Sequence, residues 1–346
     1  MRSRRRTLLF ALLPTLFLVL AAEAAVRVYD WASGGGGVRT GWYWLYERDP
    51  FLGYRARPGV SRYFGRDEQI VHSVDGFRDS RSFEEITKMQ DKHLVIAIGE
   101  SSTYGLRSGD TSGTYPAQLE AALRRLSGDD RWVVFNAGMP GYTSHEAVAL
   151  TTLRLTKLRP AVVIAMDLRN DYVFTAHYLD QAIDYNALPL KLAQRKGLWA
   201  GACATSALCG LVLTRMLPLI GDDVGGQVPP DAEQPPTPRA REQYKTNLGL
   251  LSALAEIAGF KLMLVDQPVN TTTYSPKDQT GLTVLRADMR EVAAARRIQV
   301  LEADEGFPWD LVAAGEDVHL GRAGYGALAE RIAPQVLAAC PAGRCS

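Results

Sequence analysis

The chain has 346 residues, enough for one or two domains and a sizeable buried core. Its 39 basic and 38 acidic side chains nearly balance, so no overall field points to nucleic acid as a partner. The five histidines are scattered and no HxH, HExxH or CxxC spacing occurs, so neither a metal site nor a cofactor is expected.

The N-terminus predicts export. MRSRRR precedes an uncharged apolar run over residues 7–22, and such a basic flank stays on the cytoplasmic side. Ala22-Glu23-Ala24 resembles a cleavage site, whereas the length of the run favours a retained helix in the inner membrane. Residues 1–26 are therefore expected to be a signal-anchor or a cleaved signal peptide, with the rest of the chain outside the cytoplasmic membrane.

Residues 27–92 are expected to form a Gly-rich linker and an N-terminal extension. Gly34 to Gly37 make a flexible spacer. From Trp42 to about Lys92 the chain is polar, aromatic and irregular, with short extended pieces such as QIVHS. We expect this extension to lie against the main domain.

Short apolar strands alternate with helices over residues 93–339. The predicted strands are HLVIAI, WVVFNA, AVVIAM, FKLMLV and IQVLEA. The predicted helices are TYPAQLEAALRRL, SHEAVALTTLRLTKL, LGLLSALAEIAG, VLRADMREVAAARR and AGYGALAERIAPQVLAA. This alternation predicts an α/β domain, a three-layer α/β/α (flavodoxin-like) fold with a parallel sheet of about five strands. In such sheets, ligands lie beyond the carboxyl ends of the strands.

An insertion at about 175–241 interrupts the alternation. It holds an apolar stretch, residues 198–220, in which Arg215 is the only charge, and then a proline-rich segment. The stretch predicts a buried or half-buried helix over the domain, or one that touches the bilayer surface. A complete second membrane span is rejected because it would place the two halves of the domain on opposite sides of the membrane.

The four cysteines form two pairs in the sequence. On a helix, Cys203 and Cys209 would be separated by a rise of about 9 Å, too far for a bridge, which predicts packed thiols. Cys340 and Cys345 lie close together in the C-terminal tail, residues 340–346, where a small disulfide loop could close.

Polar segments stand where three predicted strands end and before the last helix. They are GESS (99–102), NAGMPGYTS (136–144), MDLRNDY (166–172) and GEDVHLGRAGYG (315–326). Singly, each has a structural explanation, since serines cap helices, glycines allow tight turns and asparagines form Asx-turns. Together they supply what acyl transfer from an ester requires.

The required roles can be assigned to residue types in these segments. A serine of GESS would be the nucleophile, and His319 would be the base, with Glu316 or Asp317 as the carboxylate that orients it. The backbone N–H groups of Ser101 and Gly141 and the side-chain amide of Asn170 are candidate donors to the oxyanion.

In this order and spacing, the segments resemble the four blocks of the SGNH (GDSL-type) hydrolase superfamily, over roughly residues 93–339. The resemblance implies Ser101 as the nucleophile, Gly141 and Asn170 as oxyanion residues and His319 as the base. HSVDGFRD, residues 72–79, is similar to a segment upstream of the nucleophile in membrane-anchored bacterial members. The α/β-hydrolase elbow, Gly-x-Ser-x-Gly, is excluded by Thr103.

Three positions depart from the pattern of that superfamily. Glu100 stands where Asp is usual, and Leu168 where Gly is usual. Three residues before His319 the superfamily has Asp, but this chain has Glu316, followed by Asp317. Glu316 matches the spacing and Asp317 matches the residue type, so both stay candidates.

The resemblance implies a serine esterase or deacylase in the bacterial cell envelope. It would cleave a carboxylic ester, an O-acetyl ester among others, on an extracytoplasmic glycan, lipid or small molecule. The alternatives are an O-acyltransferase of an envelope polysaccharide pathway and a non-catalytic envelope scaffold with the same fold. The sequence does not determine the oligomeric state.

Overall fold

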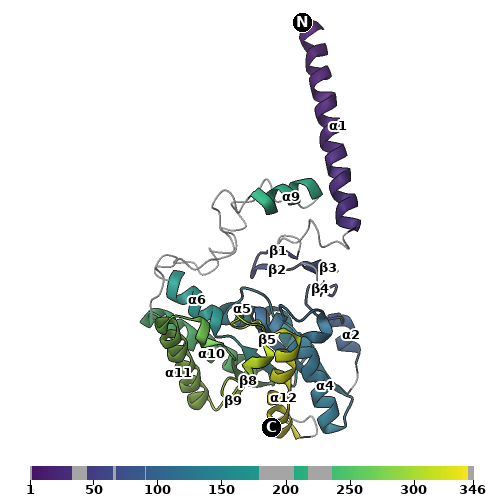
Figure 1. Cartoon of the computed structure of the whole chain (residues 1–346). Coiled ribbons are helices and arrows are strands. Elements are labelled where there is room, and N and C mark those ends of the chain that lie inside the picture. Colours follow the sequence, from purple (N-terminus) through teal and green to yellow (C-terminus); the bar gives the residue numbers. More distant parts are fainter. Residues whose placement is uncertain are drawn as a thin grey trace.

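The computed structural model describes residues 2–32, 45–64, 68–89, 91–178, 206–216 and 236–341. The Gly-rich linker, most of the insertion and the tail after residue 341 lie outside the described residues. The described part consists of an N-terminal helix, a short extension and an α/β body (Figure 1).

Five parallel strands form the central sheet, in the order β6-β5-β7-β8-β9. Their bounds are His93–Gly99 (β5), Trp132–Asn136 (β6), Val162–Met166 (β7), Lys261–Asp266 (β8) and Gln299–Glu302 (β9). The first strand of the sheet, β5, therefore lies between the second and the third, which is the flavodoxin-like order. The predicted fold class and the five strands are confirmed.

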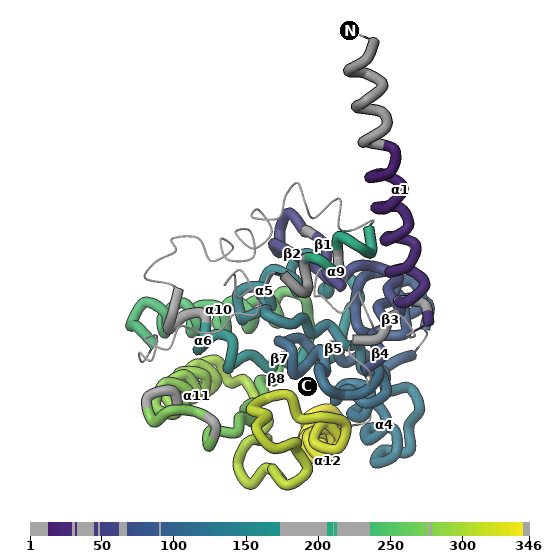
Figure 2. Tube along the Cα trace, turned by 45° about the horizontal axis from the view of Figure 1, so that its top comes forward, coloured from purple at the N-terminus to yellow at the C-terminus, as the bar shows by residue number. Residues whose placement is uncertain are grey.

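Helices cover both faces of the sheet because the strands carry apolar side chains on both faces. Along β5, Leu94, Ile96 and Ile98 pack into one core, whereas Val95 and Ala97 pack into the other. The second core is closed by α4 (Tyr115–Ser127) and α12 (Gly321–Ala339), which lie side by side (Figures 1 and 2). The first core is closed by α5 (Ser144–Leu150), α10 (Pro238–Ala258) and α11 (Pro276–Arg296).

The N-terminal extension forms two antiparallel hairpins and a short helix. The hairpins are β1 (Tyr46–Asp49) with β2 (Gly53–Ala56), and β3 (Ser61–Phe64) with β4 (Glu68–Val71). The helix α2 (Phe83–Lys88) begins at a capping box of Ser82 and Glu85.

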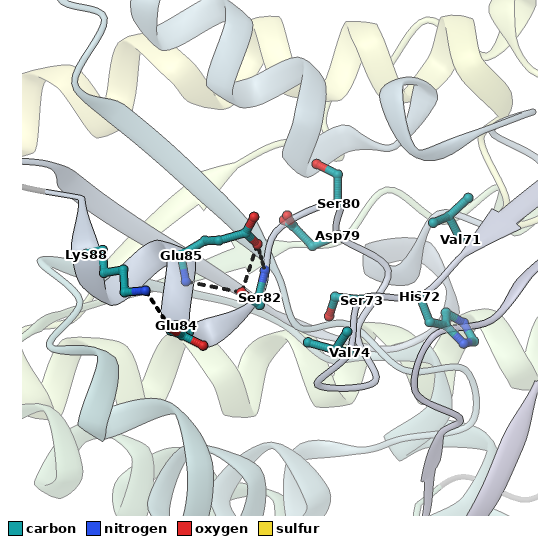
Figure 3. A pocket seen from close by; sticks show the side chains of 10 residues that line it. All are labelled: Val71, His72, Ser73, Val74, Asp79, Ser80, Ser82, Glu84, Glu85 and Lys88. Atoms are coloured by element: carbon teal, nitrogen blue, oxygen red, sulfur yellow. Dashed lines mark hydrogen bonds and ion pairs between the residues drawn. The ribbon is translucent and has the colours of Figure 1, made fainter.

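A shallow pocket lies on this extension (Figure 3). Its lining includes His72, Ser73 and the capping box of α2. None of the candidate site residues lines it. The pocket is therefore not part of the candidate site at the strand ends.

The long helix α1 (Arg2–Ala32) projects from the rest of the molecule (Figure 1). Near its end, the Glu23 carboxylate accepts hydrogen bonds from the Ser206 hydroxyl and the backbone N–H groups of Ala207 and Leu208, at 2.7–2.9 Å, at the start of α9 (Ala207–Met216). Within the described part of the chain, no helix combines the length and the apolar character that crossing a membrane requires.

The expectation of packed thiols is wrong for Cys209, which is disulfide-bonded, as is Cys340. Cys209 lies in α9, whose first residue is Ala207. Cys203 and Cys345 lie outside the described residues.

Candidate active site

Gly99, the last residue of β5, stands where no side chain fits. Its φ is +148°, and a Cβ atom would lie 2.5 Å from both the Met166 carbonyl oxygen and the Thr103 hydroxyl. The chain then enters the one-turn helix α3 (Ser101–Tyr104), which ends at Gly105 in the left-handed conformation. Ser101 is thus placed at the carboxyl edge of the sheet, next to the point where the strand order reverses.

The Ser101 hydroxyl lies 3.0 Å from Nε2 of His319. The two residues are 218 positions apart, and His319 lies in the loop that precedes α12. Burial lowers the pKa of His319, while the Asp317 and Glu316 carboxylates oppose this effect. The imidazole is therefore neutral near pH 7, and its Nε2 can accept the serine proton.

Glu316, rather than Asp317, faces the other nitrogen of the imidazole. Its Oε2 lies 3.6 Å from Nδ1 of His319, and its Oε1 lies 3.3 Å from Nε of Arg107. The ligand atoms of Glu316, Asp317 and His319 lie within 4.8 Å of one another, and no other group of three potential metal ligands occurs in the described part of the chain.

The Asp317 carboxylate is occupied by other partners. It lies 3.2 Å from Nη2 of Arg169 and accepts hydrogen bonds from the Tyr274 hydroxyl and the Val318 backbone. Burial raises the pKa of Asp317, but Arg169 and the Tyr274 hydrogen bond outweigh burial and bring it below its usual value. Asp317 is therefore an ionised anchor for the loop that carries His319.

The loop after β6 packs directly on α3, the helix that begins with Ser101. The Met139 N–H donates to the Gly99 carbonyl at 2.9 Å. A Cβ atom at Gly138 would lie 2.3 Å from the Tyr104 nitrogen, so only glycine allows this approach. Gly141, in the same loop, has a φ of +80°, in the left-handed region that favours glycine.

Asn170 lies at the start of α6 (Arg169–Tyr178), directly after β7. Its side-chain amide donates to the Tyr142 carbonyl at 2.9 Å, which joins the second and third polar segments. An amide nitrogen carries two hydrogens, so one remains for a substrate oxygen. Leu168 is fully buried in the first core, which accounts for a large apolar side chain where the SGNH pattern has glycine.

Two buried carboxyl groups hold these loops together. Glu100 accepts hydrogen bonds from the N–H groups of Arg169 and Asn170, and burial raises its pKa to about 7. Asp171 accepts from the backbone and the hydroxyl of Ser144, and burial raises its pKa to about 7 as well. Glu100 therefore joins the segments that follow β5 and β7, and Asp171 joins the segments that follow β6 and β7.

The N-terminal extension contacts the C-terminal end of α3. Arg78 is fully buried, donates to the Gly105 carbonyl at 2.8 Å and pairs with Glu68 at 2.9 Å. His72 Nε2 lies 2.6 Å from the Tyr104 hydroxyl, and burial lowers the pKa of His72 to about 4. The HSVDGFRD segment therefore contacts α3 directly.

Several residues of the site were missed in the sequence. Gln267 follows β8 and donates to the Ser102 hydroxyl at 3.1 Å, and that hydroxyl donates to the Val318 carbonyl at 3.0 Å. These bonds link α3 to the loop of His319. The position of Gln267 at the end of β8 could have identified it as a site residue, whereas no sequence feature pointed to Tyr274 or Arg107.

No family model matches the chain, and no curated protein matches it. Solved structures with a similar fold include a lipase/acylhydrolase from Enterococcus faecalis, with 16% identity, 70% of this chain and 95% of that chain covered, and a TM-score of 0.45. An alpha/beta hydrolase enzyme from the metagenome of Lake Arreo has 17% identity, 71% and 94% coverage and a TM-score of 0.44. A variant of an acetyl-xylooligosaccharide esterase from Geobacillus has 15% identity, 72% and 96% coverage and a TM-score of 0.45. At such identities an activity does not transfer from one protein to another.

Proposed function

We propose that the protein is a serine esterase or deacylase of the SGNH type. The observation that carries the proposal is the 3.0 Å contact between the Ser101 hydroxyl and His319 Nε2, at the carboxyl edge of a parallel sheet. A buried serine held against a neutral imidazole, which itself faces a carboxylate, is the arrangement that nucleophilic catalysis needs.

In the proposed mechanism, Ser101 Oγ attacks the ester carbonyl as His319 Nε2 takes its proton. The Glu316 carboxylate stabilises the imidazolium through Nδ1. The N–H groups of Ser101 and Gly141 and the free amide hydrogen of Asn170 would bind the oxyanion. The tetrahedral intermediate collapses, the alcohol leaves with the proton of His319, and an acyl-serine remains. Water, activated by the same imidazole, then releases the carboxylic acid.

The proposed substrate is an acylated glycan, lipid or small molecule outside the cytoplasmic membrane, and the chain is proposed to be exported across that membrane. The basic residues before the apolar run support export. The disulfide-bonded state of Cys209 and Cys340 supports an oxidising compartment. Proteolysis of intact spheroplasts tests this: we expect digestion of the α/β body from outside, and full protection would contradict export.

A fluorophosphonate probe on the full-length protein tests the activity. We expect labelling of the wild type and loss of labelling in Ser101→Ala and His319→Ala. The matched control Ser127→Ala should keep its labelling, because the Ser127 hydroxyl lies at the end of α4 and donates to the Leu123 carbonyl of the same helix. Equal labelling of Ser101→Ala would refute the proposed nucleophile. Folded wild-type protein without any labelling would favour the scaffold, and acyl transfer to a glycan in preference to water would identify a transferase.

A further inference from the structure

The β1–β2 hairpin reaches the loop that carries Gly141. The Tyr54 hydroxyl, on β2, donates to the carbonyl oxygen of Pro140. In the opposite direction, the Tyr142 hydroxyl donates to the Tyr54 carbonyl at 2.5 Å. The rings of Tyr54 and Tyr142 meet edge to face, with centroids 5.3 Å apart. The hairpin therefore binds the chain on both sides of Gly141.

The bond to Pro140 acts on the proposed oxyanion donor because the two groups share one peptide unit. The carbonyl of Pro140 and the N–H of Gly141 belong to the same planar amide and, in a trans peptide, point in opposite directions. Fixing the carbonyl therefore fixes the direction of the N–H. Hydrogen bonding at the carbonyl also polarises the amide and strengthens its N–H as a donor.

The contact between Tyr54 and Gly141 is close. A Cβ atom at Gly141 would lie 2.5 Å from the Tyr54 hydroxyl oxygen, so the hydroxyl fills the space beside this residue. Burial raises the pKa of Tyr54, and the nearby Glu146 carboxyl raises it further. The phenol therefore keeps its proton and stays a donor throughout the neutral range.

The second proposed donor is linked to the same tyrosine. The Asn170 amide donates to the Tyr142 carbonyl, and the Tyr142 hydroxyl is bound to the Tyr54 backbone. A displacement of the hairpin would therefore act on both donors. These bonds attach the hairpin to the loop of Gly141, so it does more than connect α1 to the body.

We propose that Tyr54 is a positioning residue of the oxyanion site, which fixes the orientation of the Gly141 N–H from the N-terminal extension. This inference rests on the proposed function. Tyr54 itself does not contact the reacting atoms; it acts through the Pro140–Gly141 peptide unit.

Tyr54→Phe in the full-length protein tests the proposal, because it removes only the hydroxyl. With p-nitrophenyl acetate we expect kcat to fall about tenfold, the worth of one hydrogen bond, with KM nearly unchanged. The matched control is Tyr325→Phe, which removes a hydroxyl that donates to the Leu106 carbonyl at 2.9 Å, and we expect it to keep the wild-type kcat. A kcat of Tyr54→Phe equal to that of the wild type would overturn the positioning role.

Hydrogen exchange supplies a readout that does not depend on turnover. We expect faster amide exchange in the peptide that covers residues 138–146 of Tyr54→Phe, and no change there in Tyr325→Phe. Unchanged exchange in Tyr54→Phe would overturn the anchoring even in an inactive protein. A wild type without Ser101-dependent turnover would refute the proposed function, while exchange would still decide whether Tyr54 holds the loop.

Discussion

Replacing Gly141 by alanine should destabilise the protein for two separable reasons. The φ of +80° is a left-handed conformation, which costs an alanine about 1–2 kcal/mol. The new Cβ atom would also lie 2.5 Å from the Tyr54 hydroxyl oxygen, and such overlap in a packed site costs about 1–3 kcal/mol. Gly141→Ala should therefore lower the free energy of unfolding by about 2–5 kcal/mol.

The Tyr54→Phe background separates the two terms. It removes the overlapping oxygen, and the next atom of the ring, Cζ, lies at 3.7 Å, an ordinary contact. In that background Gly141→Ala should cost only the backbone term, about 1–2 kcal/mol. The difference between the two backgrounds is the coupling free energy of a double-mutant cycle.

Urea unfolding of the four proteins, followed by tryptophan fluorescence, gives these free energies. Gly128→Ala is the matched control, since Gly128 has φ +68° and nothing lies within 4 Å of its added Cβ. We expect it to cost about 1–2 kcal/mol in either background. If Gly141→Ala costs the same with Tyr54 and with Phe at position 54, the proposed contact is refuted.

Three further predictions concern buried charge. The pKa of Glu100 is raised from 4.5 to about 7, so its contribution to stability is full below pH 4.5 and is lost as the pH rises through 7, about 3 kcal/mol in all. Urea unfolding of Glu100→Gln should therefore show a smaller loss of unfolding free energy with rising pH than the wild type. An unchanged pH dependence would count against this role of Glu100. His319 must be neutral to act as the base, and burial lowers its pKa, so kcat/KM should fall only below pH 6.5. Glu316→Gln removes a charge that raises this pKa, so the acid limb of the pH profile should move to lower pH while kcat falls about tenfold or more. An acid limb that stays in place would argue against the pairing of Glu316 with His319. Arg78→Met leaves the buried Glu68 carboxylate without its partner and should lower the free energy of unfolding by about 3–5 kcal/mol, which a loss below about 1 kcal/mol would contradict.

The sequence predicted the sheet and the neighbourhood of the site from local patterns. Apolar runs such as Leu94–Ile98 have the length of buried strands and are too short for buried helices. Their alternation with helices predicts a parallel sheet with both faces covered. Parallel strands end at one edge, so polar residues after each strand were expected to meet. Ser101 and His319, 218 positions apart, do meet there.

The choice between the two carboxylates could not be predicted, because it depends on partners from distant segments. Arg169 follows β7 and Tyr274 follows β8, and together they bind Asp317 and leave Glu316 to face His319. Nothing in the spacing of Glu316 and Asp317 reveals which carboxylate a remote arginine will reach.

The sequence by itself determined the fold class, because local periodicity predicts the alternating strands and helices. It also determined which polar residues follow each strand, and the common direction of parallel strands brings those residues to one edge. Only the tertiary structure decided how the extension joins the site. Tyr54 and Arg78 lie in a segment without a strong periodic pattern, and their roles arise from contacts with Pro140 and Gly105. Such contacts form between backbone groups whose positions depend on the folded chain as a whole, so no local pattern encodes them.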